Sequence, residues 1–242
     1  LTTGWKFPMN AKLVADVANY VYIRINDAAG NVRYIGTDTL LVDATKPDVG
    51  AAADMTVAPA WANAACTEVT VTAANVKDID TGGFTSGIAG VYLMKENRPD
   101  VYADVMLDDM AYELTEDGSG SYTATFAPPD ATTKYYLRAV DNAGNWNDYT
   151  KSVEVTVLVD KEGPAFTDMK QETENWAASK LLSATASEED KWVEGTRFIS
   201  SGIKTLLWSD DKDATAENGT DVFTAPEGET LKTYAYAPAT PV

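Results

Sequence analysis

The chain carries the same strand-and-turn stretch twice, 114 residues apart. Residues 21–31 and 135–145 each begin with alternating side chains and end in Asp-x-Ala-Gly-Asn. Alternation with a period of two predicts a β-strand. The Asp and Gly predict a tight turn, because an Asp side chain bonds its own downstream backbone and Gly accepts a positive φ without steric cost. The chain is therefore expected to contain copies of one β unit.

Three further landmarks recur at nearly the same period. An Asp-x-x-x-Pro sequence, a Trp-Ala pair and a Ser-Gly-Ile step occur twice each, at residues 43–47 and 160–164, 61–62 and 176–177, and 86–88 and 201–203. The Ser follows the Trp by 25 residues in both copies. A period near 115 is too long for a helical or leucine-rich solenoid, and it fits a β-sandwich of roughly 100 residues.

The order and spacing of these motifs resemble those of tandem bacterial immunoglobulin-like repeat domains of surface and secreted proteins. In that family a Trp precedes a Thr/Val-rich strand, here residues 69–72, and Ser-Gly-Ile, Asp-x-Ala-Gly-Asn and Asp-x-x-x-Pro follow in turn. The resemblance extends over nearly the whole chain. It implies an all-β fold of tandem immunoglobulin-like β-sandwich domains arranged as a rod.

The repeat divides the chain into three segments. Residues 1–46 correspond to the C-terminal part of a repeat, 47–163 to a complete β-sandwich, and 164–242 to the N-terminal part of a further repeat. Two explanations remain open for the incomplete ends. Either the sequence is a piece of a longer array, or the first segment of one molecule completes the last segment of another and builds a head-to-tail fibre by strand exchange.

Strands are expected at the alternating stretches of each segment. These are residues 1–13 (with Trp5 and Phe7), 19–26, 39–42, 67–73, 88–94, 101–107, 110–114, 121–126, 135–140, 152–158, 180–186, 203–208 and 231–236. The largely apolar faces are expected to point inward, namely Val21, Ile23 and Ile25 in the first copy and Tyr135, Leu137 and Ala139 in the second. This places Arg24 and Arg138 on the outward faces.

Composition argues against several classes of function. The net charge is −18, from 37 acidic and 19 basic residues, whereas nucleic-acid binding needs clustered Lys and Arg. The chain has no His, which removes the commonest general base and transition-metal ligand. The single cysteine, Cys66, forms no internal disulfide and is read as a small apolar residue. No apolar run approaches the roughly 18 residues of a membrane span.

Metal candidates come from the repeated turn. Asp27 with Asn31, and Asp141 with Asn145, place two oxygen-bearing side chains on each turn, and the linker residues Asp43 and Asp160 lie near the domain junctions. Ca²⁺ uses such oxygens and would stiffen a junction, although turn chemistry alone also explains these residues. Catalytic residues are not expected, because acid pairs such as those in 188–190 arise by chance among 37 acidic residues.

Flat aromatic side chains give a second candidate site. Trp61 and Trp176 recur at equivalent positions, which favours packing. Trp146 and Trp192 have no repeat partner and are therefore the candidates for a ligand surface, such as one that stacks on sugar rings.

Together with the resemblance, these patterns predict a non-enzymatic structural or adhesive stalk segment of a bacterial cell-surface or secreted protein, without a cofactor except Ca²⁺. Its partners would be neighbouring immunoglobulin-like domains, identical subunits, or a glycan or host-surface ligand. The alternatives are a carbohydrate-binding accessory module of a secreted enzyme, and the fibre subunit described above.

Overall fold

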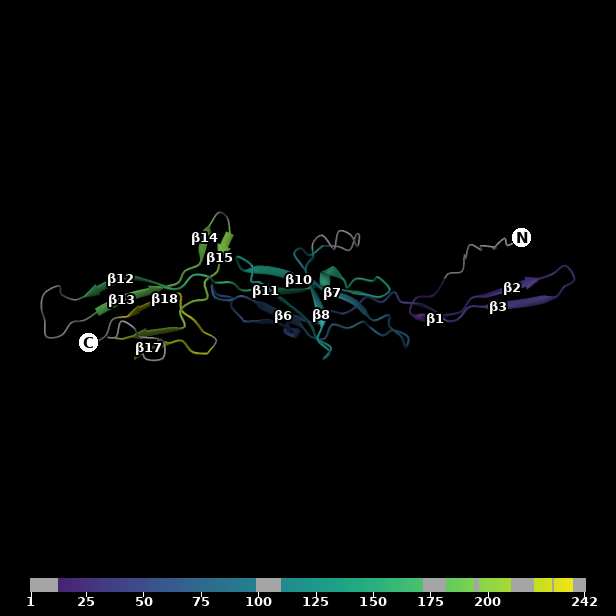
Figure 1. Cartoon of the computed structure of the whole chain (residues 1–242), viewed down its shortest axis with the longest axis horizontal. Coiled ribbons are helices and arrows are strands. Elements are labelled where there is room, and N and C mark those ends of the chain that lie inside the picture. Colours follow the sequence, from purple (N-terminus) through teal and green to yellow (C-terminus); the bar gives the residue numbers. More distant parts are fainter. Residues whose placement is uncertain are drawn as a thin grey trace. The chain divides into compact units, whose positions relative to one another are not determined.

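Regular structure among the described residues is almost entirely β, which confirms the all-β part of the predicted fold class (Figure 1). The computed structural model describes residues 13–98, 110–171, 182–193, 196–209, 220–227 and 229–236. Two short 3-10 helices, η1 (Ala52–Asp54) and η2 (Tyr149–Lys151), accompany the strands. The strands are β1 (Val17–Asn19), β2 (Tyr22–Asn26), β3 (Val32–Gly36), β4 (Leu40–Val42), β5 (Met55–Ala58), β6 (Val69–Ala73), β7 (Ile88–Met94), β8 (Met110–Glu116), β9 (Tyr122–Phe126), β10 (Thr133–Asp141), β11 (Val153–Val157), β12 (Ala165–Gln171), β13 (Leu182–Ser187), β14 (Lys191–Val193), β15 (Thr196–Phe198), β16 (Thr205–Trp208), β17 (Thr220–Thr224) and β18 (Thr233–Tyr236).

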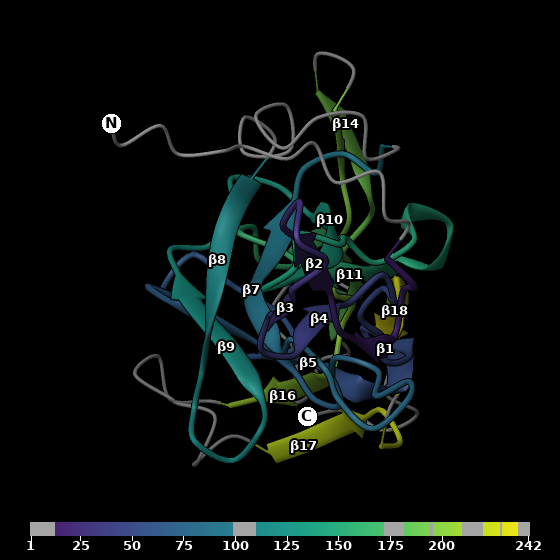
Figure 2. The same cartoon turned by 90° about the vertical axis from the view of Figure 1, so that its right-hand side faces the viewer.

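The largest sheet contains seven strands in the order β11-β10-β7-β8-β9-β6-β5, an arrangement consistent with a β-sandwich. β10 and β7 pair antiparallel, so that Leu137 lies opposite Leu93 and Ala139 opposite Val91. Strand β8 lies beside β7, and β9 lies next to β8 (Figure 2). Strand β7 thus has a hydrogen-bonded strand on each of its edges.

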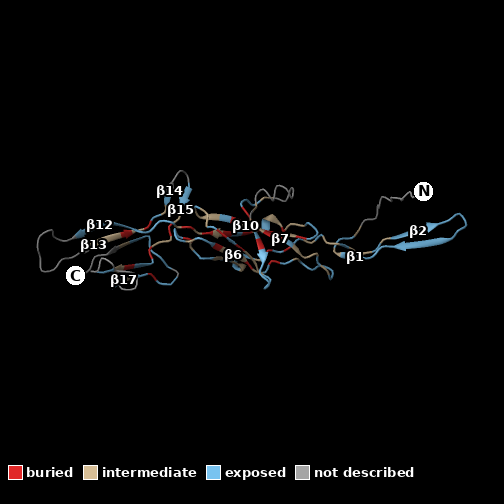
Figure 3. Cartoon of the chain, viewed as in Figure 1, coloured by how far each residue is buried: buried red, intermediate tan, exposed pale blue. Residues whose placement is uncertain are grey.

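The chain divides into two compact units. The first contains Leu1–Thr56, Val71–Ala124 and Tyr135–Val155, and the second contains the remaining residues. In the first unit, Val91 and Leu93 of β7 and Leu137 and Ala139 of β10 are 0% exposed. Both strands include red, buried segments in Figure 3. Burying alternate apolar side chains of paired strands is what holds such a sheet together.

The second unit contains smaller sheets. These are β12-β13-β18 and the antiparallel pairs β14-β15 and β16-β17. Among the described residues of this unit, the buried apolar ones are Ala62, Val69, Phe126, Val157, Val159, Ala186, Ile203, Leu206 and Ala225.

Most strand predictions agree with the structure at the level of element type. Residues 88–94 form β7 with the predicted bounds. The expected single strand 19–26 is wrong, because it is divided into β1 and β2. Several strands were not predicted, namely β3, β5, β12, β14, β15 and β17. The strands predicted at 1–13 and 101–107 fall almost wholly outside the described residues, as does Trp176.

The first copy of the repeated stretch forms an antiparallel hairpin of β2 and β3 whose ten residues are all exposed. The expectation that Ile23 and Ile25 point into a core is therefore wrong for this chain. They are 37% and 50% exposed. The corresponding face of β10 is buried as predicted, with Tyr135, Leu137 and Ala139 at most 4% exposed. The same pattern is thus buried in one copy and exposed in the other.

The placement of Arg138 on an outward, solvated face is also wrong, because this side chain is fully buried. The chain after β10 folds back over it. Nε donates to Asn147 Oδ1 (2.9 Å), Nη2 donates to the Asn147 carbonyl (3.0 Å), and Nη1 donates to the Arg98 carbonyl (3.0 Å). The guanidinium carbon lies 5.8 Å from the centre of the Trp146 ring. The alternating sequence pattern correctly predicted strand β10. It could not show that both faces of the strand are covered, because that depends on the later segment at Asn147 folding back over Arg138.

Arg138 and Arg24 provide a matched pair for testing this burial. Arg138→Ala removes hydrogen bonds to Asn147 and to the Arg98 carbonyl from a fully buried side chain, and we expect it to lower the free energy of unfolding by about 3 kcal/mol. Arg24→Ala, at the equivalent exposed position, is expected to change it by less than about 0.5 kcal/mol. Urea denaturation of both variants measures the difference, and equal effects would contradict the structural assignment.

Candidate functional site

The Asp-x-Ala-Gly-Asn turn has the same hydrogen bonds in both copies. Asn31 donates its main-chain N–H to Asp27 Oδ1 (2.8 Å) and its side-chain amide to Asp27 Oδ2 (2.6 Å). Asn145 donates the same two bonds to Asp141, both at 2.8 Å. The pKa of Asp27 is lowered, chiefly by the side-chain bond from Asn31. In the first copy, the turn therefore stabilises the ionised carboxylate of Asp27.

The linker Asp also makes the same contact twice. Asp43 Oδ2 accepts a hydrogen bond from the main-chain N–H of Ser86 (2.9 Å), and Asp160 Oδ2 accepts one from Ser201 (2.5 Å). The glycine after each Ser has a positive φ, 82° at Gly87 and 85° at Gly202. Residues other than glycine rarely adopt this backbone conformation. We call this contact between the linker carboxylate and the Ser-Gly step the linker clamp.

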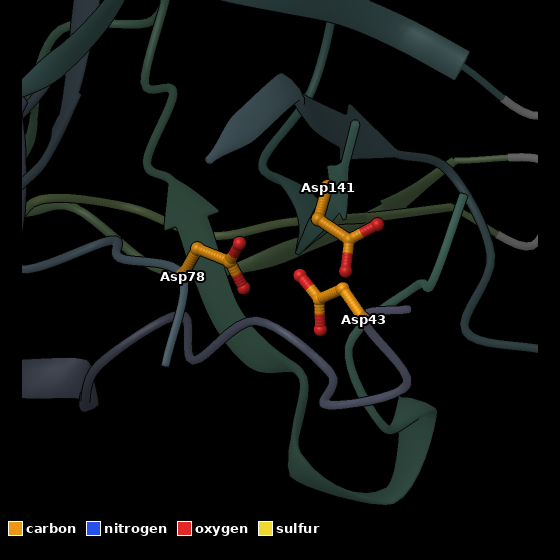
Figure 4. Close-up of side chains that lie close together, drawn as sticks. All are labelled: Asp43, Asp78 and Asp141. Carbon is orange, nitrogen blue, oxygen red and sulfur yellow. The ribbon is translucent and has the colours of Figure 1, made fainter. Parts of the chain in front are cut away.

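Three carboxylates from separate parts of the first unit converge at the Asp43 clamp (Figure 4). They belong to Asp43 in the linker, Asp78 in the loop after β6, and Asp141 at the end of β10, and one oxygen of each lies within 4.8 Å of the others. Asp141 is only 1% exposed. Asp78 Oδ2 accepts the Gly87 N–H (2.7 Å), so it holds the glycine next to the serine that Asp43 holds.

This cluster concentrates negative charge. Burial opposes ionisation of Asp43, but hydrogen bonds from the side chain and main chain of Ser86 outweigh it, so that the pKa of Asp43 is lowered. Like charges this close repel. Ca²⁺ binds six to eight oxygen atoms, usually from carboxylates and carbonyls, and would relieve that repulsion. The same oxygens also serve as a purely structural clamp through their main-chain bonds.

A second carboxylate, that of Glu188, also lies near the linker clamp at Asp160. Asp160 and Glu188 both line a pocket of about 220 Å³ in the second unit. Glu188 is 8% exposed, and its Oε2 has no hydrogen-bond partner among the described residues. Burial raises the pKa of Glu188, and the neighbouring Asp160 charge adds to that rise. Glu188 is therefore an electrostatically unfavourable buried acid at neutral pH.

A hydrogen-bonded network lies beside this pocket. Lys232 Nζ donates to Asp190 Oδ1 (2.9 Å) and to the Ser200 carbonyl (2.8 Å), and Arg197 donates to Asp190 Oδ2 (2.6 Å). The pKa of Asp190 is strongly lowered, first by Lys232, then by the Ser200 main chain and by Arg197. These bonds fix the segment that leads into the second Ser-Gly step.

The structure brings only one of the two predicted metal-binding turns into the three-carboxylate cluster. Asp141 lies in the three-carboxylate cluster, and the Asn145 amide nitrogen donates to the Asp43 carbonyl (3.1 Å). Asp27 and Asn31 lie in an exposed turn and belong to no such cluster among the described residues. Sequence reasoning missed Asp78, because its loop also contains Asp80 and nothing in the local sequence distinguishes the two.

Of the two tryptophans predicted to bind a ligand, Trp146 packs against neighbouring side chains. Trp146 is half-buried, with its ring centre 5.7 Å from that of Tyr92 and one face beside Arg138. Its ring therefore takes part in packing within the first unit. Trp192 lies in β14, paired with Arg197 of β15, and its side chain falls outside the described residues.

Comparison with known proteins gives one structural likeness. FdeC, described as a broadly conserved Escherichia coli adhesin, is similar at 17% sequence identity and a TM-score of 0.34. The match covers 78% of this chain and 55% of the FdeC chain, so this chain spans about half of that structure. No family model and no curated protein matches the chain. None of the helices among the described residues has the length and apolar character needed to cross a membrane.

The charge of the three-carboxylate cluster predicts that Ca²⁺ stabilises the first unit. Binding at a concentration 100 times the dissociation constant would add roughly 2.7 kcal/mol to the free energy of unfolding. Asp141→Asn is expected to abolish this gain, whereas Asp27→Asn, the same change in the exposed turn, should leave it intact. Thermal unfolding with Ca²⁺ and with a chelator measures the effect, and identical midpoints would contradict it.

The buried Glu188 predicts a pH-dependent effect of one substitution. Because its pKa is raised on folding, Glu188 opposes folding increasingly as pH rises above the ordinary carboxyl value of 4.5. Glu188→Gln should therefore be more stable than the wild type at pH 7, with the difference shrinking toward pH 4. Glu189→Gln, at an exposed neighbour, is the control. Urea titrations across this pH range that give a constant difference would refute the assignment.

Proposed function

We propose that this chain is a structural segment of a bacterial cell-surface or secreted protein that spaces or presents other domains, with an adhesive role for the protein as a whole. No catalytic role is assigned to it. The proposal places the chain outside the cell, where an acidic, His-free, nearly all-β chain would act through its mechanics and its surface.

The linker clamp carries this proposal. At Asp43, the first residue of the linker is bonded through its side chain to Ser86 and through its carbonyl to Asn145. Four residues later, Pro47 is already buried. The main chain of Asp48 then pairs with that of Lys77 in an isolated antiparallel β-bridge. Proline also fixes φ and removes a donor, which limits rotation further. A linker held in this way behaves as a stiff connection, which suits a spacer.

The carbohydrate-binding alternative requires an accessible aromatic face. Trp146 already uses its ring against Tyr92 and Arg138, so the observation favours packing at this position. Trp192 remains the candidate for a glycan or host-surface ligand. Saturable binding to a glycan panel that is lost in Trp192→Ala would support that alternative.

The stiffness of the linker can be measured directly. With Cys66→Ser as background, spin labels at Ala28→Cys and Glu113→Cys, both at exposed positions, report the distance between the hairpin turn and strand β8. We expect a narrow distance distribution in the otherwise unchanged chain and a broad one after Asp43→Ala, because the clamp is lost.

Asp117→Ala is the matched control. Asp117 accepts hydrogen bonds only within its own turn among those described, from Ser119, so its loss should not change the distribution. A broad distribution before any change at Asp43 would contradict the spacer role.

A further inference from the structure

The pocket of about 220 Å³ in the second unit carries an excess of negative charge. The linker that begins at Asp160, the segment after β13 and strand β15 all contribute to its lining. Five of the lining residues are acidic and two are lysines. Whether the pocket attracts a cation depends on whether these two lysines already neutralise its acids.

Each of the two lysines is already paired with an acid. Lys161 Nζ lies 3.1 Å from Asp130 Oδ1, and Lys191 forms an ion pair with Glu162. The other three lining acids, one of which is Glu188, make no ion pair with any described residue. The pocket therefore keeps negative charge that its own lysines do not neutralise.

Glu188 is the lining acid with an unsatisfied oxygen. The residue is only 8% exposed, and its Oε2 accepts no hydrogen bond within the described part of the chain. The charges that act on it are those of Asp160 and Lys232, but Lys232 Nζ donates instead to Asp190 and Ser200. A buried carboxylate oxygen without a donor is costly, so a donor that enters the pocket would be stabilised there.

The lining favours an organic cation over a metal ion. Ca²⁺ needs roughly six to eight converging oxygens, and the only described group of three acids with ligand atoms within 4.8 Å of one another is Asp43, Asp78 and Asp141. The pocket is also far larger than one ion requires, since a water molecule takes roughly 30 Å³ of the liquid. Phe198 and Ile199 add apolar surface to its lining, which suits a hydrocarbon chain.

We propose that this pocket binds an alkylammonium group, the chemistry of a lysine side chain, with the ammonium at Glu188 and the alkyl chain at Phe198. An ammonium group has three donors and no acceptor, so it matches a carboxylate oxygen that lacks a donor. The phenylalanine ring offers apolar contact to the methylene groups and a cation–π contact to the charge. The site would let a lysine-bearing partner attach beside the linker clamp at Asp160, which goes beyond the spacer role.

The first experiment is an NMR titration of residues 1–242 with N-α-acetyl-lysine amide. We expect saturable shifts of the main-chain amide signals of Glu188 and Phe198, with a dissociation constant of about 1 mM for a ligand of this size. N-α-acetyl-norleucine amide has a similar alkyl chain without the ammonium group, and it should leave these signals unchanged. The absence of saturable shifts, or equal shifts with the norleucine compound, would overturn the proposal.

The second experiment repeats this titration with two variants. Glu188→Gln should weaken binding by about tenfold or more, because it removes the charge that holds the ammonium. Glu68→Gln, at an exposed acid outside the pocket, should bind as the wild type does. Equal binding by both variants would overturn the assignment. Ca²⁺ that displaces the amine and shifts the same amide signals would also overturn it, because the pocket would then be a metal site.

A third titration, with the free diamine cadaverine, distinguishes the sources of this chemistry. Tighter binding of the lysine amide would support a lysine side chain of a protein as the ligand, and tighter binding of cadaverine would support a free diamine. Both results support the alkylammonium site. None of these results bears on the spacer proposal, which the linker distance measurement tests separately.

Discussion

A hydrogen bond between a linker carboxylate and a serine main-chain N–H holds each Asp-x-x-x-Pro linker of this protein against a Ser-Gly loop. It occurs at Asp43 with Ser86 and again at Asp160 with Ser201. The acceptor is charged, so each bond is stronger than an ordinary neutral one. It also provides a hydrogen-bond acceptor for a main-chain N–H in a loop. The glycine after each serine lets the chain turn back toward the linker, so the sequence motif and the contact belong together.

Charge accumulates around this contact in different ways at the two positions. At the first clamp, Asp78 and Asp141 join Asp43, and the three carboxylates lie within reach of one cation. At the second, Glu188 lies near Asp160, and one of its oxygens has no hydrogen-bond partner in the part of the chain that the structure describes. A clamp that gathers acids in this way is stable only if hydrogen bonds or a cation compensate their repulsion. This links the linker geometry to the predicted effects of Ca²⁺ and pH.

Much of the local structure follows from the sequence, because turn chemistry and alternation are local. The Asp-x-Ala-Gly-Asn turns and strand β7 are examples, and they form for the reasons that predicted them. Burial could not be predicted in the same way. Ile23 and Leu137 have the same local pattern and opposite exposure, and Arg138 is covered only because the chain at Asn147 returns over it. Asp78 was missed for the same reason, since only the fold brings its loop to the linker.

Amide hydrogen exchange at Ser86 and Ser201, measured by NMR, tests the linker clamp most directly. The account predicts slow exchange at both amides in the unaltered chain. Asp43→Ala should accelerate exchange at Ser86 and leave Ser201 unchanged, because each carboxylate protects only its own serine. Fast exchange at Ser86 before any substitution, or exchange that does not respond to Asp43→Ala, would contradict the clamp and the stiff linker that follows from it.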